Sequence, residues 1–435
     1  MMGLPALPRK LPSRNWLIFW TLTGTLTATI IYDRREKRKA TARWAASVAH
    51  LAKEPLPANN ASAMPRKLTV YLAAPPGDGL RTAQDHFREY VKPVLAASGL
   101  DWEFRQGRQQ GDIRAVVAEE VRKRRRRAEA EEEVVNEADL ATTEEHIEQW
   151  RRQHGIAEYD GVRGDIVIGR HTWKEYLRGL HEGWLGPLRA PPHAQPDPEP
   201  EVVEGEDQEK RPKRPAQPKP YNSIEDYATA HLPTTIPEEL APSTPLPFPH
   251  ILGFLNTPIR TYRYLTRRRL ADEIGRDVAA ACLCTYREYK ELSDANLEQK
   301  WEQQAALAHE EGNWVKSVWK PDEEAAPEKK ADTAAAADDA SPTAEGSELV
   351  DGSKPQPTTV KKDKIWPKPI VLDPRIAMRM RRFEIQPEDE QRARDVVVPE
   401  EEIEGVIKGS LRSLWRWGTG AFEKKEKIPN VGEVD

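Results

Sequence analysis

The hydrophobic pattern of the chain begins with an uncharged run of 18 residues from Asn15 to Tyr32. As a helix, this run would be about 27 Å long, which approaches the thickness of a bilayer core. Trp16 and Trp20 lie near one end and Tyr32 lies at the other, and such aromatic side chains prefer the headgroup layer. The pattern predicts an N-terminal transmembrane helix over residues 15–32, preceded by a basic arm over 1–14.

Two targeting signals are alternative interpretations of this run. A cleaved secretory signal has an apolar region of about 7–15 residues followed by small residues, whereas this run is longer and continues as Tyr-Asp-Arg-Arg. A mitochondrial presequence is a continuous basic helix, which Pro5, Pro8 and Pro12 prevent here. The pattern therefore favours an uncleaved anchor. Its orientation stays open, because basic residues flank both ends.

One face of the predicted helix carries small and hydroxyl side chains. Thr21, Gly24, Thr25 and Ala28 follow one another at the spacing i, i+3, i+4 and i+7. Such residues let a second helix approach closely and form hydrogen bonds across the contact. We predict that this face binds a partner helix; the alternative is a lipid-facing anchor that happens to contain threonines.

Beyond the anchor, short apolar runs alternate with helical patterns. Residues 67–74, 100–104, 164–169 and 250–255 are predicted strands, and most of the segments between them have helical spacing of apolar residues. Strands that alternate with helices form a parallel sheet covered on both faces. The expected fold class is therefore α/β: a small, mostly parallel sheet with helices on both faces, interrupted by disordered insertions and preceded by one transmembrane helix.

Composition sets apart the segments that are expected not to pack. Only 38% of the 435 residues are hydrophobic and 37 are proline, so part of the chain lacks the apolar content of a globular core. The Pro-rich residues 190–249 and the Ala-, Asp- and Glu-rich residues 321–364 are predicted disordered insertions.

The expected segments, in chain order, are the basic arm 1–14, the transmembrane helix 15–32, a juxtamembrane helix and linker 33–65, the first part of the α/β domain 66–189, the insertion 190–249, the second part of the domain 250–320, the insertion 321–364, a returning core segment 365–385, and a C-terminal region 386–435 with an amphipathic helix over 403–417.

No motif in the chain indicates catalysis, cofactor binding or a metal site. The best candidate is the turn Pro75–Gly79 between a strand and a helix, where backbone N–H groups could hold a phosphate. Thr82 stands where the dinucleotide fingerprint requires glycine, so we favour a tight turn with Asp78 as the helix N-cap. Cys282 and Cys284 are the two cysteines, and they point to different sides of a predicted helix, which excludes their pairing.

Three charged or aromatic clusters have two interpretations each. The basic run Arg122–Arg127 suits nucleic acid or anionic lipid, but the acidic residues that follow it favour a solvated helix face. The helix over 403–417 suits either a membrane interface or packing on the sheet, and its candidate membrane contacts are Arg412, Trp415, Arg416 and Trp417. The cluster of Tyr262, Tyr264 and Arg267–Arg269 is ambiguous in the same way, and ordinary surface is favoured over a membrane interface. The net charge of −5 provides no field that would attract nucleic acid, so no nucleic acid partner is expected.

Six segments of the chain, in this order, form a recognisable set: LPSRNW at 11–16, YDRREK at 32–37, residues 67–100, residues 164–188, residues 373–383 and SLWRWG at 413–418. This set resembles one known family, that of the carrier-translocase subunit of about fifty-four kilodaltons in the fungal mitochondrial inner membrane. The resemblance covers the anchor and most segments expected to be ordered, but not the insertions.

The resemblance implies a non-enzymatic protein of the inner membrane with one span and its bulk in the intermembrane space. It also implies a role in inserting multi-spanning carrier proteins, with the pore and small-chaperone subunits of the translocase as partners, and an inner-membrane AAA protease as a possible assembly partner. The family supplies no catalytic, cofactor or metal residues. Two alternatives remain open from the residues: a membrane-tethered enzyme with a nucleotide-binding-like core, and a lipid-contacting organiser that acts through residues 403–422.

Overall fold

The structure is a computed structural model of the whole chain. It describes residues 13–54, 64–130, 146–147, 150–151, 153–156, 159, 161–192, 218–292, 300–312, 314, 366, 369–400, 403 and 414. The predicted insertion over 321–364 lies outside these residues. So do Arg412, Trp415, Arg416 and Trp417, so the prediction for the C-terminal helix is untested.

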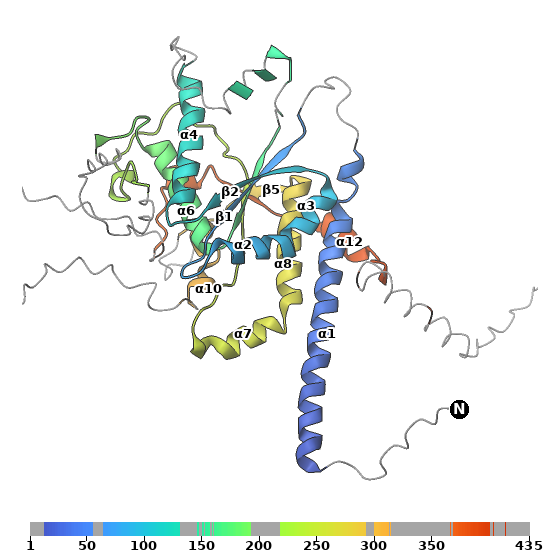
Figure 1. Cartoon of the computed structure of the whole chain (residues 1–435). Coiled ribbons are helices and arrows are strands. Elements are labelled where there is room, and N and C mark those ends of the chain that lie inside the picture. Colours follow the sequence, from blue (N-terminus) through green and yellow to red (C-terminus); the bar gives the residue numbers. More distant parts are fainter. Residues whose placement is uncertain are drawn as a thin grey trace, which may run out of the picture.

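A single long helix, α1 (Arg14–Val48), forms the N-terminal part of the described chain. It spans both the predicted anchor and the first part of the predicted juxtamembrane segment, and it is continuous through Tyr32. Its second half packs against the domain and buries Trp44 and Val48. Its first half projects away from the rest of the molecule (Figure 1).

The structure does not confirm the predicted transmembrane helix over 15–32. The residues are helical, but within the described part of the chain no helix combines the length and the apolar character needed to cross a membrane. The reason lies in the composition of the run. Five threonines, Gly24 and Asn15 stand among the large apolar residues and lower its mean hydropathy.

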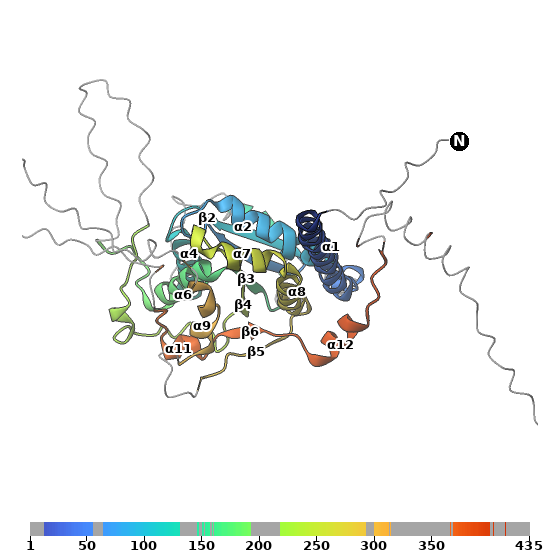
Figure 2. The ribbon, with the colours of Figure 1, turned by 90° about the horizontal axis from the view of Figure 1, so that it is seen from below.

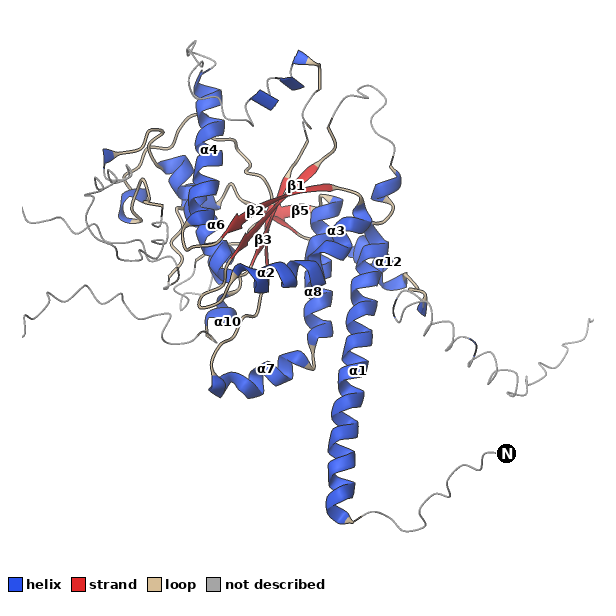
Figure 3. Cartoon of the chain, in the orientation of Figure 1, coloured by secondary structure: helices blue, strands red, loops and turns tan. Residues whose placement is uncertain are grey.

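The core is a six-stranded sheet with the order β2-β1-β3-β4-β6-β5 (Figure 3). Its strands are β1 (Lys67–Ala73), β2 (Asp101–Gly107), β3 (Gly164–Ile168), β4 (Ser243–Leu246), β5 (Tyr286–Glu288) and β6 (Arg381–Phe383). Neighbouring strands run parallel except β5, which is antiparallel to β6. The predicted mostly parallel sheet is confirmed.

Helices cover both faces of the sheet, as predicted. Alternation along β1 sends Leu68, Val70 and Leu72 into one core and Tyr71 and Ala73 into the other. The first core is covered by α1, α2 (Leu80–His86), the π-helical segment η2 (Phe87–Val91), α3 (Lys92–Ser98), α8 (Arg267–Leu283) and α12 (Pro387–Asp395). The second is covered by α4 (Asp112–Ala130), α6 (Arg170–Leu185) and α11 (Pro374–Ala377).

The remaining described elements are short. They are η1 (Leu51–Lys53), η4 (Glu225–Tyr227), η5 (Phe254–Asn256), α7 (Thr257–Tyr264), α9 (Glu302–Ala305) and α10 (Ala308–Glu311). Seen from below, α7 lies across the sheet and α1 stands at its side (Figure 2).

The prediction of a disordered insertion over 190–249 is wrong for its described part. Residues 218–249 include η4 and the interior strand β4, whose residues are all buried. Pro245 is tolerated within this strand because the carbonyls of Pro242 and Leu246 bond β3, so the Pro245 nitrogen faces β6. That strand pairs with β4 at Ser243 alone and needs no donor from Pro245.

Two further predictions differ from the structure. Residues 250–255 are loop and η5 rather than a strand, because β4 already occupies the place beside β3. The helix predicted to hold both cysteines contains only Cys282, because α8 ends at Leu283, Cys284 adopts a left-handed conformation and Tyr286 begins β5. Both cysteines are free, as predicted. The returning core segment is confirmed: Ile370, Leu372, Ile376 and Phe383 are buried.

Candidate functional site

The exposed half of α1 is the most distinctive surface of the described chain. Its large apolar side chains face solvent on all sides instead of packing on the domain: Trp16, Leu17, Ile18, Phe19, Trp20, Leu22, Leu26, Ile31 and Tyr32 are exposed. Soluble proteins rarely expose so many contiguous apolar residues, so such a surface marks a contact with a membrane or with another protein.

The predicted partner-helix face lies within this half. Thr21, Gly24, Thr25 and Ala28 are all exposed, and a Cβ atom added to Gly24 would meet no other atom within 4 Å. The face is therefore open and shallow. It has the shape that allows a second helix to approach closely.

The threonines of α1 satisfy their own hydroxyl groups. Thr25 Oγ1 donates to the Thr21 carbonyl at 2.7 Å, and Thr21 Oγ1 donates to the Ile18 carbonyl at 2.9 Å. Thr23, Thr27 and Thr29 bond the preceding turn in the same way. Because each hydroxyl already has an acceptor, moving these side chains out of water costs less than burying a free hydroxyl. The predicted helix contact would thus rest on close packing rather than on threonine hydrogen bonds.

Asp33 fixes the point at which the exposed half of α1 ends. Its carboxylate accepts hydrogen bonds from the backbone N–H groups of Arg267 at 3.1 Å and Arg268 at 3.3 Å, and it pairs with the Arg268 guanidinium at 3.2 Å. It therefore caps the first turn of α8 from another helix, where the helix dipole favours a negative charge. The uncharged run of α1 ends one residue earlier, so its end is level with the start of α8.

The second half of α1 is clamped against α8 further along. A Cβ on Gly275 would come within 2.4 Å of the Trp44 ring, so only glycine allows the two helices to pack this closely. The Trp44 indole N–H donates to Asp272 at 2.7 Å, and Arg43 pairs with the same carboxylate. These contacts hold the projecting half of α1 in a defined direction relative to the sheet.

The turn Pro75–Gly79 lies against residues 248–252 on one side. Leu252 lies so close to Gly77 that a Cβ there would meet it at 2.8 Å, and the Asp78 carboxylate faces the His250 ring at 3.3 Å. The N-cap prediction for Asp78 is wrong: Gly79 occupies that position, and Asp78 instead accepts from the Gly79 N–H at 2.7 Å. The sequence did not reveal this interaction with the 248–252 segment, and Gly77, Asp78 and Gly79 stay exposed.

The basic run Arg122–Arg127 turns partly inward, contrary to the prediction of a solvated face. Arg122 pairs with buried Glu182 of α6 and stacks on the Tyr221 ring at 3.6 Å from its centre. Arg125 donates to the carbonyls of Gly183 at 2.7 Å and Gly186 at 2.9 Å. The prediction holds for Arg126, which is exposed and pairs with Glu119.

Glu182 also pairs with Arg114, so one buried carboxylate joins two buried arginines between α4 and α6. The helices approach closely here, because a Cβ on Gly179 or Gly183 would collide with Val117 or Val121. Sequence reasoning missed this cluster. The glycines four residues apart in α6 were the available signal for close helix packing.

Other buried titratable groups are bound to the backbone. Glu310 accepts from the N–H groups of Phe248 at 2.7 Å and Arg170 at 3.3 Å, and burial raises its pKa to about 8. Burial likewise lowers the pKa of His86, His171 and His181 to about 4, so these rings are neutral near pH 7. Within the described ranges, no group of three or more Cys, His, Asp or Glu side chains could hold a metal ion. These groups support the fold.

His181 gives this pattern a measurable pH dependence. Its Nδ1 donates to the Leu177 carbonyl at 2.7 Å, and its Nε2 accepts a hydrogen bond from the Asp373 N–H at 2.9 Å. A second proton on the ring would sit on Nε2, where it would point at the Asp373 N–H and break this hydrogen bond. Because the folded pKa is depressed, the stability contributed by His181 is present above pH 6.5 and is lost as the pH falls towards 4. The expected loss between pH 7 and pH 5 is about 2 kcal/mol.

This contribution is isolated by comparing the chain with H181Q in denaturant unfolding of the detergent-solubilised protein. The deficit of the variant should be largest at pH 7 and shrink by about 2 kcal/mol at pH 5, because the variant lacks the titrating ring. Buried carboxyls with raised pKa values change the free energy of unfolding with pH in both proteins. Their contribution therefore cancels when the two proteins are compared. A deficit that stays constant over this range would contradict a neutral, hydrogen-bonded His181.

Comparisons with known proteins match nearly the whole chain. The family described as "Inner membrane protein import complex subunit Tim54" matches residues 1–207 and 194–383. The chain is 51% identical over 452 residues to the Neurospora crassa protein named mitochondrial import inner membrane translocase subunit tim54, covering 99% of this chain and 89% of that protein. Proteins of the same name from Aspergillus fumigatus and Aspergillus oryzae are 41% and 39% identical, over 96% and 99% of this chain and 99% of each relative.

Proposed function

Because this chain belongs to the Tim54 family of inner membrane protein import complex subunits, we propose that it is a non-enzymatic subunit that assists insertion of multi-spanning proteins into the mitochondrial inner membrane. The observation that carries the proposal is the match over 99% of the chain to a relative named as a translocase subunit. The names of the relatives place them at the mitochondrial inner membrane, and we assign this chain to the same membrane.

The described residues support a role in docking partners rather than in catalysis. In the turn Pro75–Gly79, the best candidate for a phosphate site, the Asp78 and Gly79 N–H groups are already bonded, to the Pro75 carbonyl and to the Asp78 carboxylate. The buried carboxyls and histidines bond the backbone within the core. The alternative of a membrane-tethered enzyme is therefore not favoured, and the family names imply a role without catalysis.

The exposed half of α1 is the proposed point of attachment to the membrane. Its apolar side chains are exposed instead of packed in the described core, and its threonine hydroxyls bond their own helix, which lowers the cost of leaving water. We propose that residues 15–32 insert into the inner membrane as a single pass, with the sheet domain in the intermembrane space. The second half of α1, clamped on α8, then holds the domain close to the membrane.

The proposed partners divide between these two parts. The face Thr21, Gly24, Thr25 and Ala28 would pack on a helix of the pore subunit, since its open, shallow surface suits close helix packing. The sheet domain would bind the small-chaperone subunits of the translocase, and an inner-membrane AAA protease during assembly is a further proposed partner.

The test is a pair of substitutions on the proposed helix face. G24L together with A28L should reduce co-purification of the membrane subunits in mild detergent by about tenfold, as expected for a loss of about 1–2 kcal/mol of helix packing. Import of a radiolabelled multi-spanning carrier into isolated mitochondria should fall with it. Yield and proteolysis of the variant are compared in parallel, to show that the domain remains folded.

The matched control adds bulk to the opposite side of the same helix. Leu22 and Leu26 lie roughly 160–200° around from Gly24, so L22F together with L26F should leave co-purification unchanged. Equal recovery of partners from the chain and from the G24L/A28L variant would contradict the proposed face. An equal loss of co-purified partners from the G24L/A28L and L22F/L26F variants would show that the effect is not specific to the proposed face.

A further inference from the structure

The loop and helix after β4 form a second exposed apolar surface, which neither the family assignment nor the predicted helix face accounts for. We define the α7 surface as residues 254–264, that is η5 and α7 together. Phe254 and Leu255 are about nine-tenths exposed, and none of the α7 residues is buried. Tyr262 and Tyr264 are also exposed, so the surface presents large apolar and aromatic side chains to solvent.

The charge of this stretch has one sign. Between Ile251 and Ala271 the chain contains five arginines and no acidic residue. Arg260 and Arg269 are exposed. Arg267 pairs with Glu89 at 3.6 Å and stacks on Tyr264, and Arg268 pairs with Asp33. Arginines beside exposed aromatic and aliphatic side chains are the combination that suits the interface of an anionic bilayer.

The position of the α7 surface is fixed relative to the uncharged run of α1. Asp33 follows that run directly and bonds the N–H groups of Arg267 and Arg268 at the start of α8. Arg268 also lies over the Tyr32 ring, 5.3 Å from its centre. Since α7 ends at Tyr264, three residues before α8, its C-terminal end lies at the level where the uncharged run of α1 ends.

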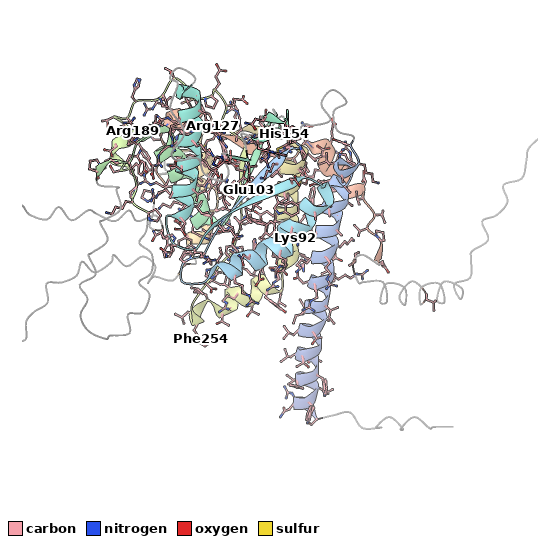
Figure 4. The ribbon with its side chains drawn as sticks, turned by 45° about the horizontal axis from the view of Figure 1, so that its top comes forward. Lys92, Glu103, Arg127, His154, Arg189 and Phe254 are labelled. Carbon is pink, nitrogen blue, oxygen red and sulfur yellow. The ribbon has the colours of Figure 1, made fainter. Side chains whose placement is uncertain are left out.

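The direction of α7 completes the geometry. It runs away from this junction, across the direction of α1, along the underside of the domain (Figures 1 and 2). Phe254 lies at the lowest part of the domain, at the far end of α7 (Figure 4). If residues 15–32 enter a bilayer, α7 is therefore held parallel to the membrane plane, at the depth of its headgroups.

We propose that the α7 surface rests on the lipid surface of the inner membrane, with Phe254 and Leu255 inserted at the boundary of headgroups and acyl chains and Arg260 beside anionic phosphates. This proposal rests on the proposed insertion of α1. Two contacts, one through α1 and one through α7, fix both the distance and the tilt of the sheet domain over the membrane. A single helix would leave the domain free to rotate around the helix axis.

The experiment uses the full chain in vesicles of phosphatidylcholine with phosphatidylglycerol, doped with a phospholipid that carries a diazirine in the upper part of its acyl chain. After illumination, mass spectrometry locates lipid adducts. Adducts are expected both within 15–32 and within 254–262. Peptides that contain Val397, which is as exposed as Leu255 but lies after α12, should carry none.

Three variants and one change of lipid test the assignment. F254D together with L255D should remove the adducts from α7 and leave those within 15–32, whereas V397D should change neither. R260Q should lower labelling of α7 by about fivefold, as expected for the loss of one arginine near an anionic surface, and omission of phosphatidylglycerol should lower it at least as much.

The outcomes separate this inference from the proposed function. Adducts within 15–32 without adducts on α7 would overturn the lipid contact of α7 alone. No adducts within 15–32 would contradict the insertion of α1. If α7 is unlabelled in vesicles but becomes protected from protease in the isolated complex, the α7 surface binds a protein subunit, and the lipid assignment is wrong.

Discussion

Replacing Glu182 with leucine is expected to lower the free energy of unfolding by about 3–5 kcal/mol, which is a large share of the stability of an ordinary domain. The side chains of Arg114 and Arg122 are 0% and 3% exposed, and both pair with this one carboxylate. Without Glu182, two guanidinium groups lose their shared buried anion between α4 and α6. Denaturant unfolding of the solubilised chain measures the change.

Glu119 provides a matched control for this prediction. It contacts the same Arg122 at 3.1 Å, but its side chain is 54% exposed, so E119L should cost less than about 1 kcal/mol. The triple variant R114M, E182L and R122M should recover most of the loss, because apolar side chains of similar size replace the whole buried network. If E182L and E119L prove equally mild, the cluster is not an important contributor to stability.

Replacing Leu22 and Leu26 with lysine is expected to release the protein from the membrane. Both side chains are exposed in the middle of the uncharged run, at 65% and 49%. A lysine at the centre of an inserted helix costs about 2.5–3.5 kcal/mol, so two lysines oppose insertion by roughly 5–7 kcal/mol. The variant should move from the pellet to the supernatant in alkaline carbonate extraction.

The control for this change is V397K, which places a lysine at an exposed apolar position outside α1. It should leave the chain in the carbonate pellet. Soluble L22K/L26K protein must also keep the protease resistance of the sheet domain, because release by unfolding would carry no information about α1. A folded double variant that stays in the pellet would contradict attachment through this half of the helix.

Local patterns in the sequence were sufficient to predict three of the six strands, β1, β2 and β3. The runs at 67–74 and 164–169 are apolar and β-branched, and they correspond to β1 and β3. The return of residues 365–385 to the core followed from their apolar content between two polar stretches. These predictions succeeded because burial of a strand between two helical layers requires a nearly continuous hydrophobic run.

The strand β4 could not be predicted in the same way. Its sequence, Ser-Thr-Pro-Leu, follows a Pro-rich segment and has neither alternation nor a long apolar run. Its place in the sheet depends on pairing with β3. At the end of this pairing the Leu246 carbonyl accepts a hydrogen bond from the Gly169 N–H, which directly follows β3, at 2.9 Å. Pairing between distant segments leaves no local signal, so composition alone predicted an insertion.

The inward turn of the basic run was missed for a related reason. Arg122 and Arg125 look like surface residues in a run of six bases, and only the partner helix α6 reveals their acceptors. The orientation of α7 was equally hidden, because it depends on the bond between Asp33 and the start of α8. The helix face around Gly24 was predicted by residue spacing, since that pattern is local to one helix, and its partner is still a prediction.

The most direct test of the account is protease treatment of mitochondria whose outer membranes have been opened, followed by carbonate extraction. We predict that protease added from outside digests residues 64–400. It should leave a fragment that contains residues 15–32 in the carbonate pellet, while a matrix protein stays intact. A sheet domain that resists digestion until the inner membrane is lysed, or a chain that carbonate releases whole, would contradict a domain held by α1 on the intermembrane side.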